Sequence, residues 1–267
     1  MLLTFRDLFV GASDYDDTDA FSAYFNRYTP KDPNVNALWL DFSPRLDEWE
    51  MLLSYFEDYA FDLAEQGTLI TNYSFRWPDN VGVHSKTLDE MAVDGFQLGQ
   101  YALLQQPASR TLPQPDHPLT IQPVTESNWE DYNALQQTGN AAYGTRYQAA
   151  KAPYYAFTRE WPSIRQYGLY QDQTLAGAFE LIEGINHVEL DQLLIRPDYQ
   201  GQGIGTVLLT QLMTTLPHPL VMKVDREDEA VMHFYQQLNC QEIATQIMAM
   251  APFSDEFISE LADYLPD

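Results

Sequence analysis

Three glycines at alternate positions, Gly201, Gly203 and Gly205, give the strongest chemical signal in this sequence of 267 residues. They follow a segment ending at Ile195 that we expect to be a strand, and they open an apolar segment, 203–216, that we expect to be a helix. The first backbone N–H groups of a helix have no acceptor within it, and the helix dipole is positive there. Glycines would let a phosphate approach these donors closely, so the pattern predicts an anion site. The spacing matches neither a Gly-Lys-Ser/Thr nucleotide loop nor the dinucleotide motif.

Alternation of strands and helices around the glycines predicts a mixed α/β sheet. Before them, a strand and a helix are followed by strands expected at 165–171, 174–183 and 187–195. Short turn-like links join these three strands, which is typical of an antiparallel meander. After the helix at 203–216, strand, helix and strand follow up to residue 250, and this order requires crossover connections.

A proline-rich segment, 107–118, separates two parts of the chain. Its prolines remove backbone donors and disfavour helix, so we expect a linker between a domain at 1–106 and a domain at 119–267. The elements expected over 37–104 repeat the order strand, helix, strand, helix, strand found over 187–250. No repetition of individual residues accompanies this order, so duplication and coincidence both stay open.

Acidic residues greatly outnumber basic ones. The chain has 39 Asp and Glu against 14 Lys and Arg, a formal net charge of −25 with neutral histidines. Nucleic acids and anionic membranes bind proteins that neutralise phosphates with basic side chains, so we expect neither as a partner. A cationic small molecule or a basic protein fits this charge better, although solubility alone also explains it.

Cysteine content and hydropathy indicate the cellular location of the protein. Cys240 is the only cysteine, which excludes an internal disulfide and a multi-cysteine metal site. His187 and His233 lack the spacing of metal ligands, so we expect no metal. The apolar N-terminus is interrupted by Arg6 and Asp7, and no run of about 18 apolar residues occurs, so we expect neither a signal peptide nor a membrane span. These features favour a cytoplasmic protein of undefined oligomeric state.

The segment around the glycines resembles the GNAT family of acyl-CoA-dependent N-acyltransferases. The family motif Q/R-x-x-G-x-G/A matches Gln200 to Gly205, which follow a family-like IRPDY. A second motif, a short helix ending in Phe-Tyr with Gly-Phe shortly after, is similar to 228–240, where Asn239 takes the place of the glycine. Asn tolerates left-handed backbone, so the turn can form. The resemblance covers about 119–250 and implies the GNAT fold, with a second, degenerate GNAT-like domain if the duplication is real.

The resemblance implies that acetyl-CoA is the cosubstrate. It would lie between the strand ending at Ile195 and the strand 220–225, with its pyrophosphate on the glycine loop. Asp228 stands where the family usually has Asn, and Gln202 where a basic residue is frequent, for which Arg196 could compensate in part. The residues that the resemblance places against acetyl-CoA are Leu193, Leu194, Ile195, Arg196, Gln200, Gly201, Gln202, Gly203, Ile204, Gly205, Thr206 and Asp228.

Acetyl transfer to an amine requires a base, because an amine with a pKa of roughly 10 is mostly protonated near neutral pH. His187, Glu189 and Asp191 alternate along an expected strand and therefore share one face. Glu189 lies eleven residues before Gln200, where some GNAT members have a catalytic glutamate, so it is the first candidate. A backbone N–H of the same strand could stabilise the oxyanion. Tyr235 matches the family tyrosine that protonates the departing CoA thiolate.

Other assignments stay open at this point. Glu189 also fits a solvated strand residue, with Asp191, Glu180 or water as the base, and Tyr235 also fits the core. The segment 41–50 of the N-terminal half has no glycine and several carboxylates, so we expect no CoA there. The sequence therefore favours an N-acetyltransferase for a small amine or a basic protein side chain. A non-catalytic CoA-binding or interaction protein and a ligase-like tandem transferase are the alternatives.

Overall fold

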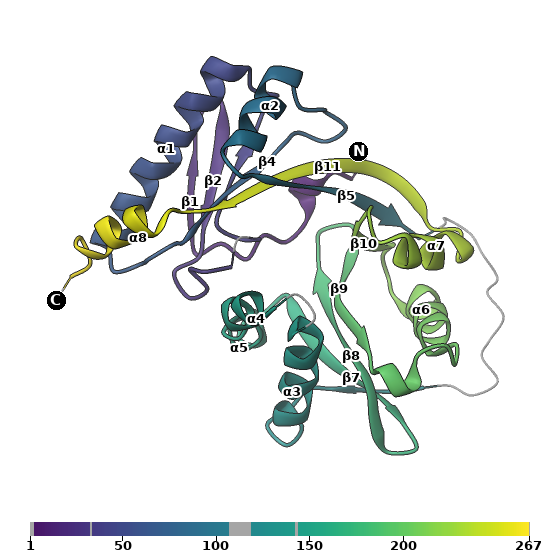
Figure 1. Ribbon diagram of the computed structural model, residues 1–267. Helices are drawn as coiled ribbons and strands as arrows, with labels where there is room; N and C mark the ends of the chain where they lie inside the picture. The colour runs from purple at the N-terminus through teal and green to yellow at the C-terminus, as the bar shows by residue number, and fades with distance from the viewer. Residues whose placement is uncertain (1–2, 33, 107–118, 142–143, 267) are drawn as a thin grey trace. The chain divides into compact units, whose positions relative to one another are not determined.

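The computed structural model describes residues 3–32, 34–106, 119–141 and 144–266 (Figure 1). Contacts between residues divide the chain into two units. Unit 1 comprises Met1–Phe9, Ala102–Val224 and Asp228–Ile243, and unit 2 comprises Val10–Tyr101, Asp225–Glu227 and Ala244–Asp267. These units interleave along the sequence, whereas the division expected from the sequence is continuous. The expected linker, 107–118, lies outside the described residues.

Unit 1 contains the glycine loop and most of the expected meander. Its elements are β6 (Thr120–Pro123), α3 (Trp129–Asn140), α4 (Thr145–Lys151), α5 (Tyr154–Arg159), β7 (Ile164–Gln171), β8 (Thr174–Glu183), β9 (Val188–Ile195), α6 (Ile204–Thr215), β10 (Leu220–Asp225) and α7 (Glu229–Gln237). The strand order is β10-β9-β8-β7-β6. Neighbouring strands are antiparallel except β9 and β10, which are parallel because α6 connects them.

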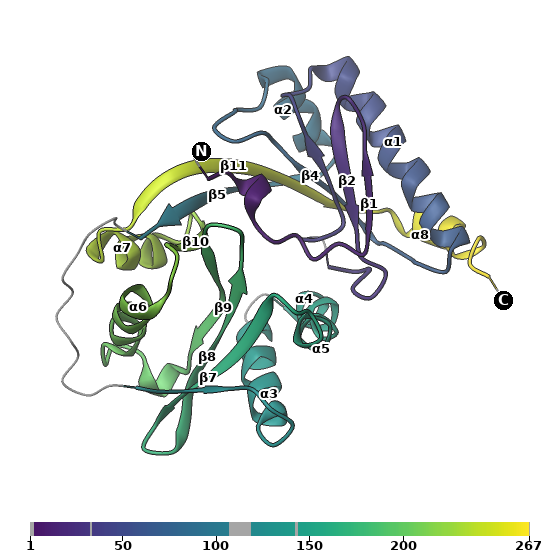
Figure 2. The ribbon, with the colours of Figure 1, turned by 180° about the vertical axis from the view of Figure 1, so that it is seen from behind.

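Both faces of the unit 1 sheet are covered by helices. Successive strand residues point to opposite faces, so Ala178 packs with Tyr132 and Tyr155 on one side, and Phe179 packs in the cluster that contains Leu208 and Leu209 of α6. Figures 1 and 2 show α3, α4 and α5 on one side of β7, β8 and β9, and α6 on the other. The glycine loop thus leads from the sheet into a helix with a buried apolar face.

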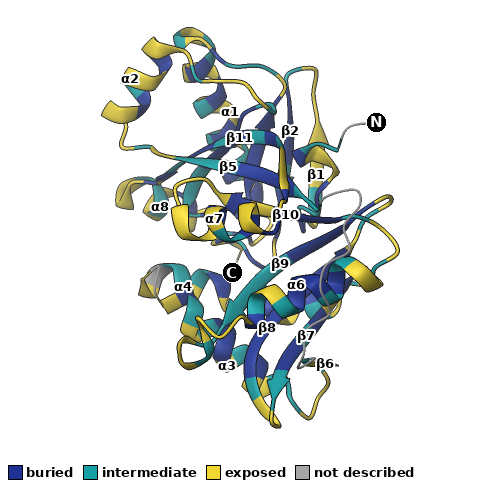
Figure 3. Ribbon diagram, turned by 90° about the vertical axis from the view of Figure 1, so that its right-hand side faces the viewer, coloured by how far each residue is buried: buried dark blue, intermediate teal, exposed yellow. Residues whose placement is uncertain are grey.

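Unit 2 combines a second part of the mixed sheet with helices. Its elements are β1 (Asp14–Asp17), β2 (Phe21–Phe25), β3 (Ala37–Leu40), α1 (Leu46–Glu65), β4 (Asn72–Arg76), α2 (Ser85–Val93), most of β5 (Gln97–Gln105), most of β11 (Gln241–Pro252) and α8 (Asp255–Ala262). The strand order is β1-β2-β3-β4-β11, with only β3 and β4 parallel. Buried aromatic rings hold α1 on this sheet, with the Trp49 and Phe75 centroids 4.6 Å apart. The strands β2 and β3 are largely buried, whereas β1 and α2 are largely exposed (Figure 3).

The elements of residues 37–104 (the first set) and of residues 187–250 (the second set) follow the same order, but the last strand of each set lies beside strands of the other set. In each set a helix joins two parallel strands, β3 to β4 and β9 to β10. The last strand of the second set, β11, pairs with β4 from Met248 to Pro252. The end of the first set reaches β10, where Gln106 N–H donates to the Leu220 carbonyl at 2.9 Å. This exchange is the reason that the units interleave.

Most expected elements are present, including every helix and strand that flanks the glycine loop. The sequence prediction missed β1 and β2. The strand β1 reads DYDD and is mostly exposed, so it carries no apolar alternation that would identify it. None of the described helices combines the length and the apolar character needed to cross a membrane.

Candidate active site

The strands β9 and β10 separate soon after they begin. They pair only at Val188 with Leu220 and at Glu189 with Val221, although β9 continues to Ile195 and β10 to Asp225. On its other side β9 stays paired with β8. Backbone N–H and C=O groups of β9 that face β10 beyond this point therefore lack a partner in that strand, and an extended ligand could pair with them.

A bulge in β9 lies at the opening. The register with β8 shifts between Ala178 and Glu180, and Gln192 has a φ of 51°. Beyond it, the N–H of Arg196 donates to Ala176 of β8 at 2.9 Å. Since N–H groups of successive strand residues point in opposite directions, those of Ile195 and of the residue two positions before it point away from β8. The expected residues 193–195 are all half-buried at this edge.

Two of the three glycines adopt backbone that other residues avoid. Gly201 has a φ of 72°, and Gly203, the N-cap of α6, has a φ of 78°. A Cβ atom at either position would meet no atom within 4 Å, so these glycines are needed for conformation and face open space. At Gly205 a Cβ atom would lie 3.1 Å from the Phe234 ring, so this glycine allows α6 and α7 to pack closely.

The first amides of α6 are left without acceptors inside the helix. No side chain caps the helix at Gly203, and the first intrahelical bond joins Val207 N–H to the Gly203 carbonyl at 3.0 Å. The preceding amides of Ile204, Gly205 and Thr206 are thus the donors expected at a helix start. Together with the dipole of the helix they form the anion-binding end predicted from the glycines.

Polar side chains of the loop bond to the loop itself and to the adjacent strands. Arg196 pairs with Asp198 at 2.7 Å and donates to the Leu175 carbonyl at 3.0 Å. Gln200 donates to the Ile195 carbonyl at 2.9 Å, and Gln202 donates to the carbonyl of Asp198 at 2.8 Å. Arg196, which could compensate for the missing basic residue, is therefore already paired with the carboxylate of Asp198. An anion at this loop would be held chiefly by backbone amides.

The carboxylate of Glu189 is buried beside two donors. Only 8% of the residue is exposed. Its Oε1 accepts from the N–H of Phe9 at 2.7 Å and lies 3.3 Å from Nε2 of His187. Burial raises the pKa of Glu189, while the hydrogen bonds from His187 and Phe9 lower it. The expected shared face thus brings His187 and Glu189 together, and the donor at Phe9 is one that sequence reasoning missed.

A second buried carboxyl group lies opposite Asp191. Glu180 of β8 is paired in register with Asp191 and is fully buried. Its Oε1 accepts hydrogen bonds at 2.9 to 3.1 Å, and its Oε2 has no partner among the described residues. The donors to Oε1 are Tyr132, Thr158 and Gln166. Burial, with the charge of Asp191 as a smaller cause, raises the pKa of Glu180 to about 7. The three donors come from different elements, so no sequence pattern linked them.

Tyr235 and Asp228 occupy the helix α7. Tyr235 is 6% exposed, packs beside Phe234 at 5.2 Å between ring centroids, and has its pKa raised by burial. In the part of the chain that the structure describes, no residue bonds to its hydroxyl group. Asp228 caps the helix by accepting from Val231 N–H at 3.0 Å. The turn after the helix has Asn239 at a φ of 58°, which confirms that Asn adopts the left-handed backbone there.

Comparisons with known proteins agree with this geometry. A family model described as the acetyltransferase (GNAT) family matches residues 122–239. Spermidine N(1)-acetyltransferase of Escherichia coli K12 is 32% identical over 139 residues, which are 46% of this chain and 72% of that protein. The chain belongs to the GNAT family.

Solved structures extend the likeness to the rest of the chain. A functionally unknown conserved protein from Staphylococcus epidermidis matches 93% of this chain and 97% of its own, with a TM-score of 0.80 and 18% identity. A tandem GNAT protein from the clavulanic acid biosynthesis pathway matches 88% of this chain and 79% of its own, with a TM-score of 0.52 and 12% identity. These likenesses show the fold alone. They confirm the expected mixed α/β GNAT fold.

The start of α1 differs from the GNAT loop at α6. The N–H of Arg45, at the N-cap, donates to the Glu48 side chain at 2.8 Å, so a carboxylate already occupies this helix end. A surface pocket of about 550 Å³ at this point is lined by Arg45, His84 and Lys86 as well as by Asp47 and Glu50. The basic residues from the start of α2 were not foreseen from the sequence. That unit 2 holds no CoA stays a prediction.

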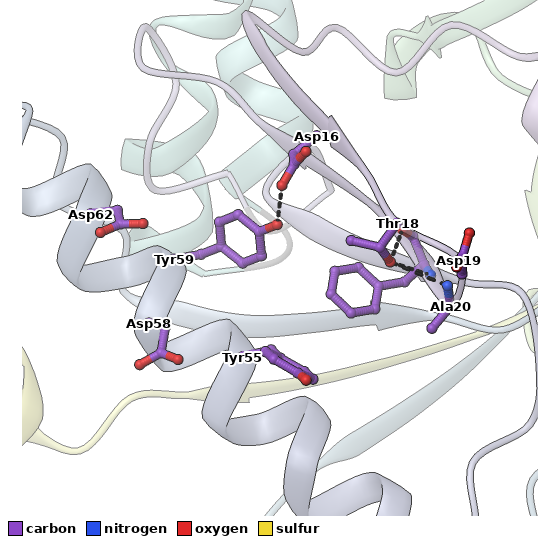
Figure 4. Close-up of a pocket in the computed structure, with 9 residues that line it drawn as sticks. Asp16, Thr18, Asp19, Ala20, Tyr55, Asp58, Tyr59 and Asp62 are labelled. Carbon is purple, nitrogen blue, oxygen red and sulfur yellow. Dashed lines mark hydrogen bonds between the residues drawn. The ribbon is translucent and has the colours of Figure 1, made fainter.

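A second pocket of unit 2, about 490 Å³, lies between α1 and the turn after β1 (Figure 4). Four carboxylates and two tyrosines are among its lining residues, and Tyr59 donates to Asp16. Burial and this carboxylate raise the pKa of Tyr59. The lining contains no basic side chain and no glycine, so it is unlike a phosphate site.

Proposed function

We propose that this protein transfers the acetyl group of acetyl-CoA to a primary amine. The observation that carries the proposal is the separation of β9 from β10 directly before a glycine-capped helix start. The opening offers unpaired strand backbone to an extended chain, and the helix start offers amides to a pyrophosphate. Membership in the GNAT family supports the same reading.

The binding roles follow from the directions of backbone groups. The amides of Leu193 and Ile195 would pair with the pantetheine of acetyl-CoA, while Leu194 packs on the opposite face against α3 and α5. The amides of Ile204 to Thr206 would hold the pyrophosphate, with Gly201 and Gly203 giving it room. Asp228 and Arg196 would contribute by fixing α7 and the loop rather than by contacting phosphate.

Chemistry would begin with loss of a proton from the substrate ammonium to Glu189, directly or through water. The free amine then attacks the thioester carbonyl, and an unpaired N–H of β9 stabilises the oxyanion. When the intermediate collapses, the C–S bond breaks and Tyr235 gives its proton to the CoA thiolate. The amine nitrogen loses its second proton, which returns Tyr235 to its neutral form directly or through water. The products are the N-acetylated amine and CoA. Burial raises the pKa of Glu189, which strengthens it as a base.

The acceptor is proposed to be a small amine carrying several positive charges. The net charge of −25 attracts such a substrate, and one relative is a spermidine N(1)-acetyltransferase. Asp191 at the edge of the opening is half-buried and supplies negative charge there. We further propose cytoplasmic action, and that residues 1–106 form a degenerate GNAT-like companion to the domain in 119–267.

Two experiments test the proposal. Acetyl-CoA at millimolar concentration should raise the unfolding temperature, because a ligand of the folded state stabilises it by mass action. Gly203→Glu places a charge where the phosphate would bind and should abolish this shift. Gly95→Glu is the matched control, because Gly95 is also exposed, also has a left-handed φ, of 77°, and also has space for a Cβ atom with no other atom within 4 Å. Equal shifts in both variants would refute the assigned loop.

The second experiment identifies the acceptor. Thiol release from acetyl-CoA would be followed with a panel of mono-, di- and polyamines and with basic peptides. Turnover that increases with the number of amine charges is expected. Binding of acetyl-CoA without turnover of any amine would favour the non-catalytic alternative.

A further inference from the structure

Residues 3–9 belong to unit 1, and Phe9 contacts Glu189 of β9. A short turn, Phe5–Asp7, opens this segment, and Phe5 and Leu8 are 1% and 9% exposed. The Phe9 ring packs edge-on against Trp161, with centroids 5.2 Å apart. Apolar burial and a ring contact therefore fix the segment at its start and at its end.

At its end the segment reaches the proposed base. The N–H of Phe9 donates to Oε1 of Glu189 at 2.7 Å, across 180 positions of sequence. The same oxygen lies 3.3 Å from Nε2 of His187, which is 4% exposed. None of the residues that the structure describes donates to Oε2 of Glu189. One oxygen is thus held while the other is left for a proton.

We propose that the N-terminal segment is a positioning element of the active site, in which the Phe9 N–H orients the Glu189 carboxylate and keeps it ionised so that Oε2 accepts the substrate proton. The inference rests on the proposed role of Glu189. The family model begins at residue 122, so this donor comes from outside the segment that the family shares.

Few charged or titratable groups surround Glu189. The charged or titratable groups that face it are His187 and Asp191, both on β9. Its neighbours on the flanking strands are Ile182 of β8 and Val221 of β10, which do not titrate. Burial and Asp191 raise the pKa of Glu189, whereas the bonds from His187 and Phe9 lower it. Loss of the Phe9 donor would therefore raise the pKa, and a smaller share of Glu189 would be ionised at a given pH.

Phe9→Pro removes this N–H, and Phe9→Ala is its matched control, because both lose the ring but only the first loses the donor. The preceding Leu8 has φ −78° and ψ 157°, an extended conformation that a following proline permits. The acidic limb of the kcat/KM profile should move upward by about one pH unit in Phe9→Pro, since hydrogen bonds to charged groups are strong. In Phe9→Ala the limb should stay where it is in the wild type, whatever the rate.

A second measurement needs neither substrate nor the proline variant. The amide ¹H and ¹⁵N shifts of Phe9 should titrate with Glu189 in the wild-type protein and should lose that titration in Glu189→Gln. A Phe9 amide that does not respond to pH, or an unmoved limb in a folded Phe9→Pro, would overturn the role of Phe9 alone. Near wild-type kcat/KM in Glu189→Gln would overturn the base itself, and the positioning role with it.

Discussion

Replacing Glu180 by Gln should change how the stability of the protein depends on pH. The Glu180 carboxyl is fully buried, and three donors bind its Oε1. Its Oε2 has no partner in the described part of the chain. A glutamine keeps an oxygen for the three donors and removes the ionisable group. Its amide nitrogen adds a buried donor, but the cost of that donor does not change with pH.

The direction and size follow from linkage between protonation and folding. Burial raises the pKa of Glu180 from 4.5 to about 7 in the folded protein, so the folded state holds this proton more tightly than the unfolded state does. The proton's stabilising effect is full below about pH 4.5, is lost as pH rises toward about 7, and changes little above that. At about 1.36 kcal/mol per pKa unit, the whole loss is about 3 kcal/mol.

Urea unfolding of the wild type and of Glu180→Gln at about pH 5 and about pH 8 measures this effect. Between the two pH values the wild type should lose about 2 to 3 kcal/mol more stability than the variant. Glu183→Gln is the control, because Glu183 ends the same strand with its side chain 56% exposed. Equal pH dependence in the wild type and Glu180→Gln would refute a neutral buried carboxyl at this site.

Three further predictions concern catalysis and folding. Glu189→Gln should lower kcat/KM by roughly 10²- to 10⁴-fold, with partial rescue at high pH. Tyr235→Phe should lower kcat by a smaller factor and leave the affinity for acetyl-CoA nearly unchanged. Steady-state rates measured across pH test both predictions. The fragment 119–267 lacks β5, which bonds to β10, and β4, which pairs with β11, so it should unfold at a lower temperature than the whole chain by circular dichroism. A fragment as stable as the full protein would contradict the exchange of strands.

The sequence predicts the glycine loop well because its cause is local. Gly201 and Gly203 have left-handed φ angles that other residues avoid, and Gly205 has no room for a Cβ atom, so the residue types reveal the turn. Expected strands and helices were likewise found because apolar periodicity marks each element by itself. The loop and the elements that flank it could thus be read from residues that are neighbours in the sequence.

Strand partners and the surroundings of the carboxylates could not be read in this way. Apolar periodicity indicates that β5 and β11 are strands. It gives no sign that β5 lies beside β10 or that β11 lies beside β4. The Phe9 N–H is a backbone group 180 positions from Glu189, and any residue but proline would supply it. Glu180 lies in an apolar strand, and its donors come from α3, α5 and β7. Such contacts depend on tertiary packing, which no local pattern encodes.

The negative charge of the chain is compatible with both proposed ligands, a cationic amine and the anionic acetyl-CoA, because their two sites use different kinds of group. A protein of net charge −25 attracts a cationic amine, and half-buried Asp191 lies at the opening. The same charge repels acetyl-CoA, and the nearby Arg196 is already paired with Asp198. Backbone amides at the start of α6 are unaffected by this shortage of basic side chains, since they carry fixed partial charges that need no counter-ion and no titration. Acidity can therefore favour the acceptor without removing the phosphate site, provided that glycines keep those amides accessible.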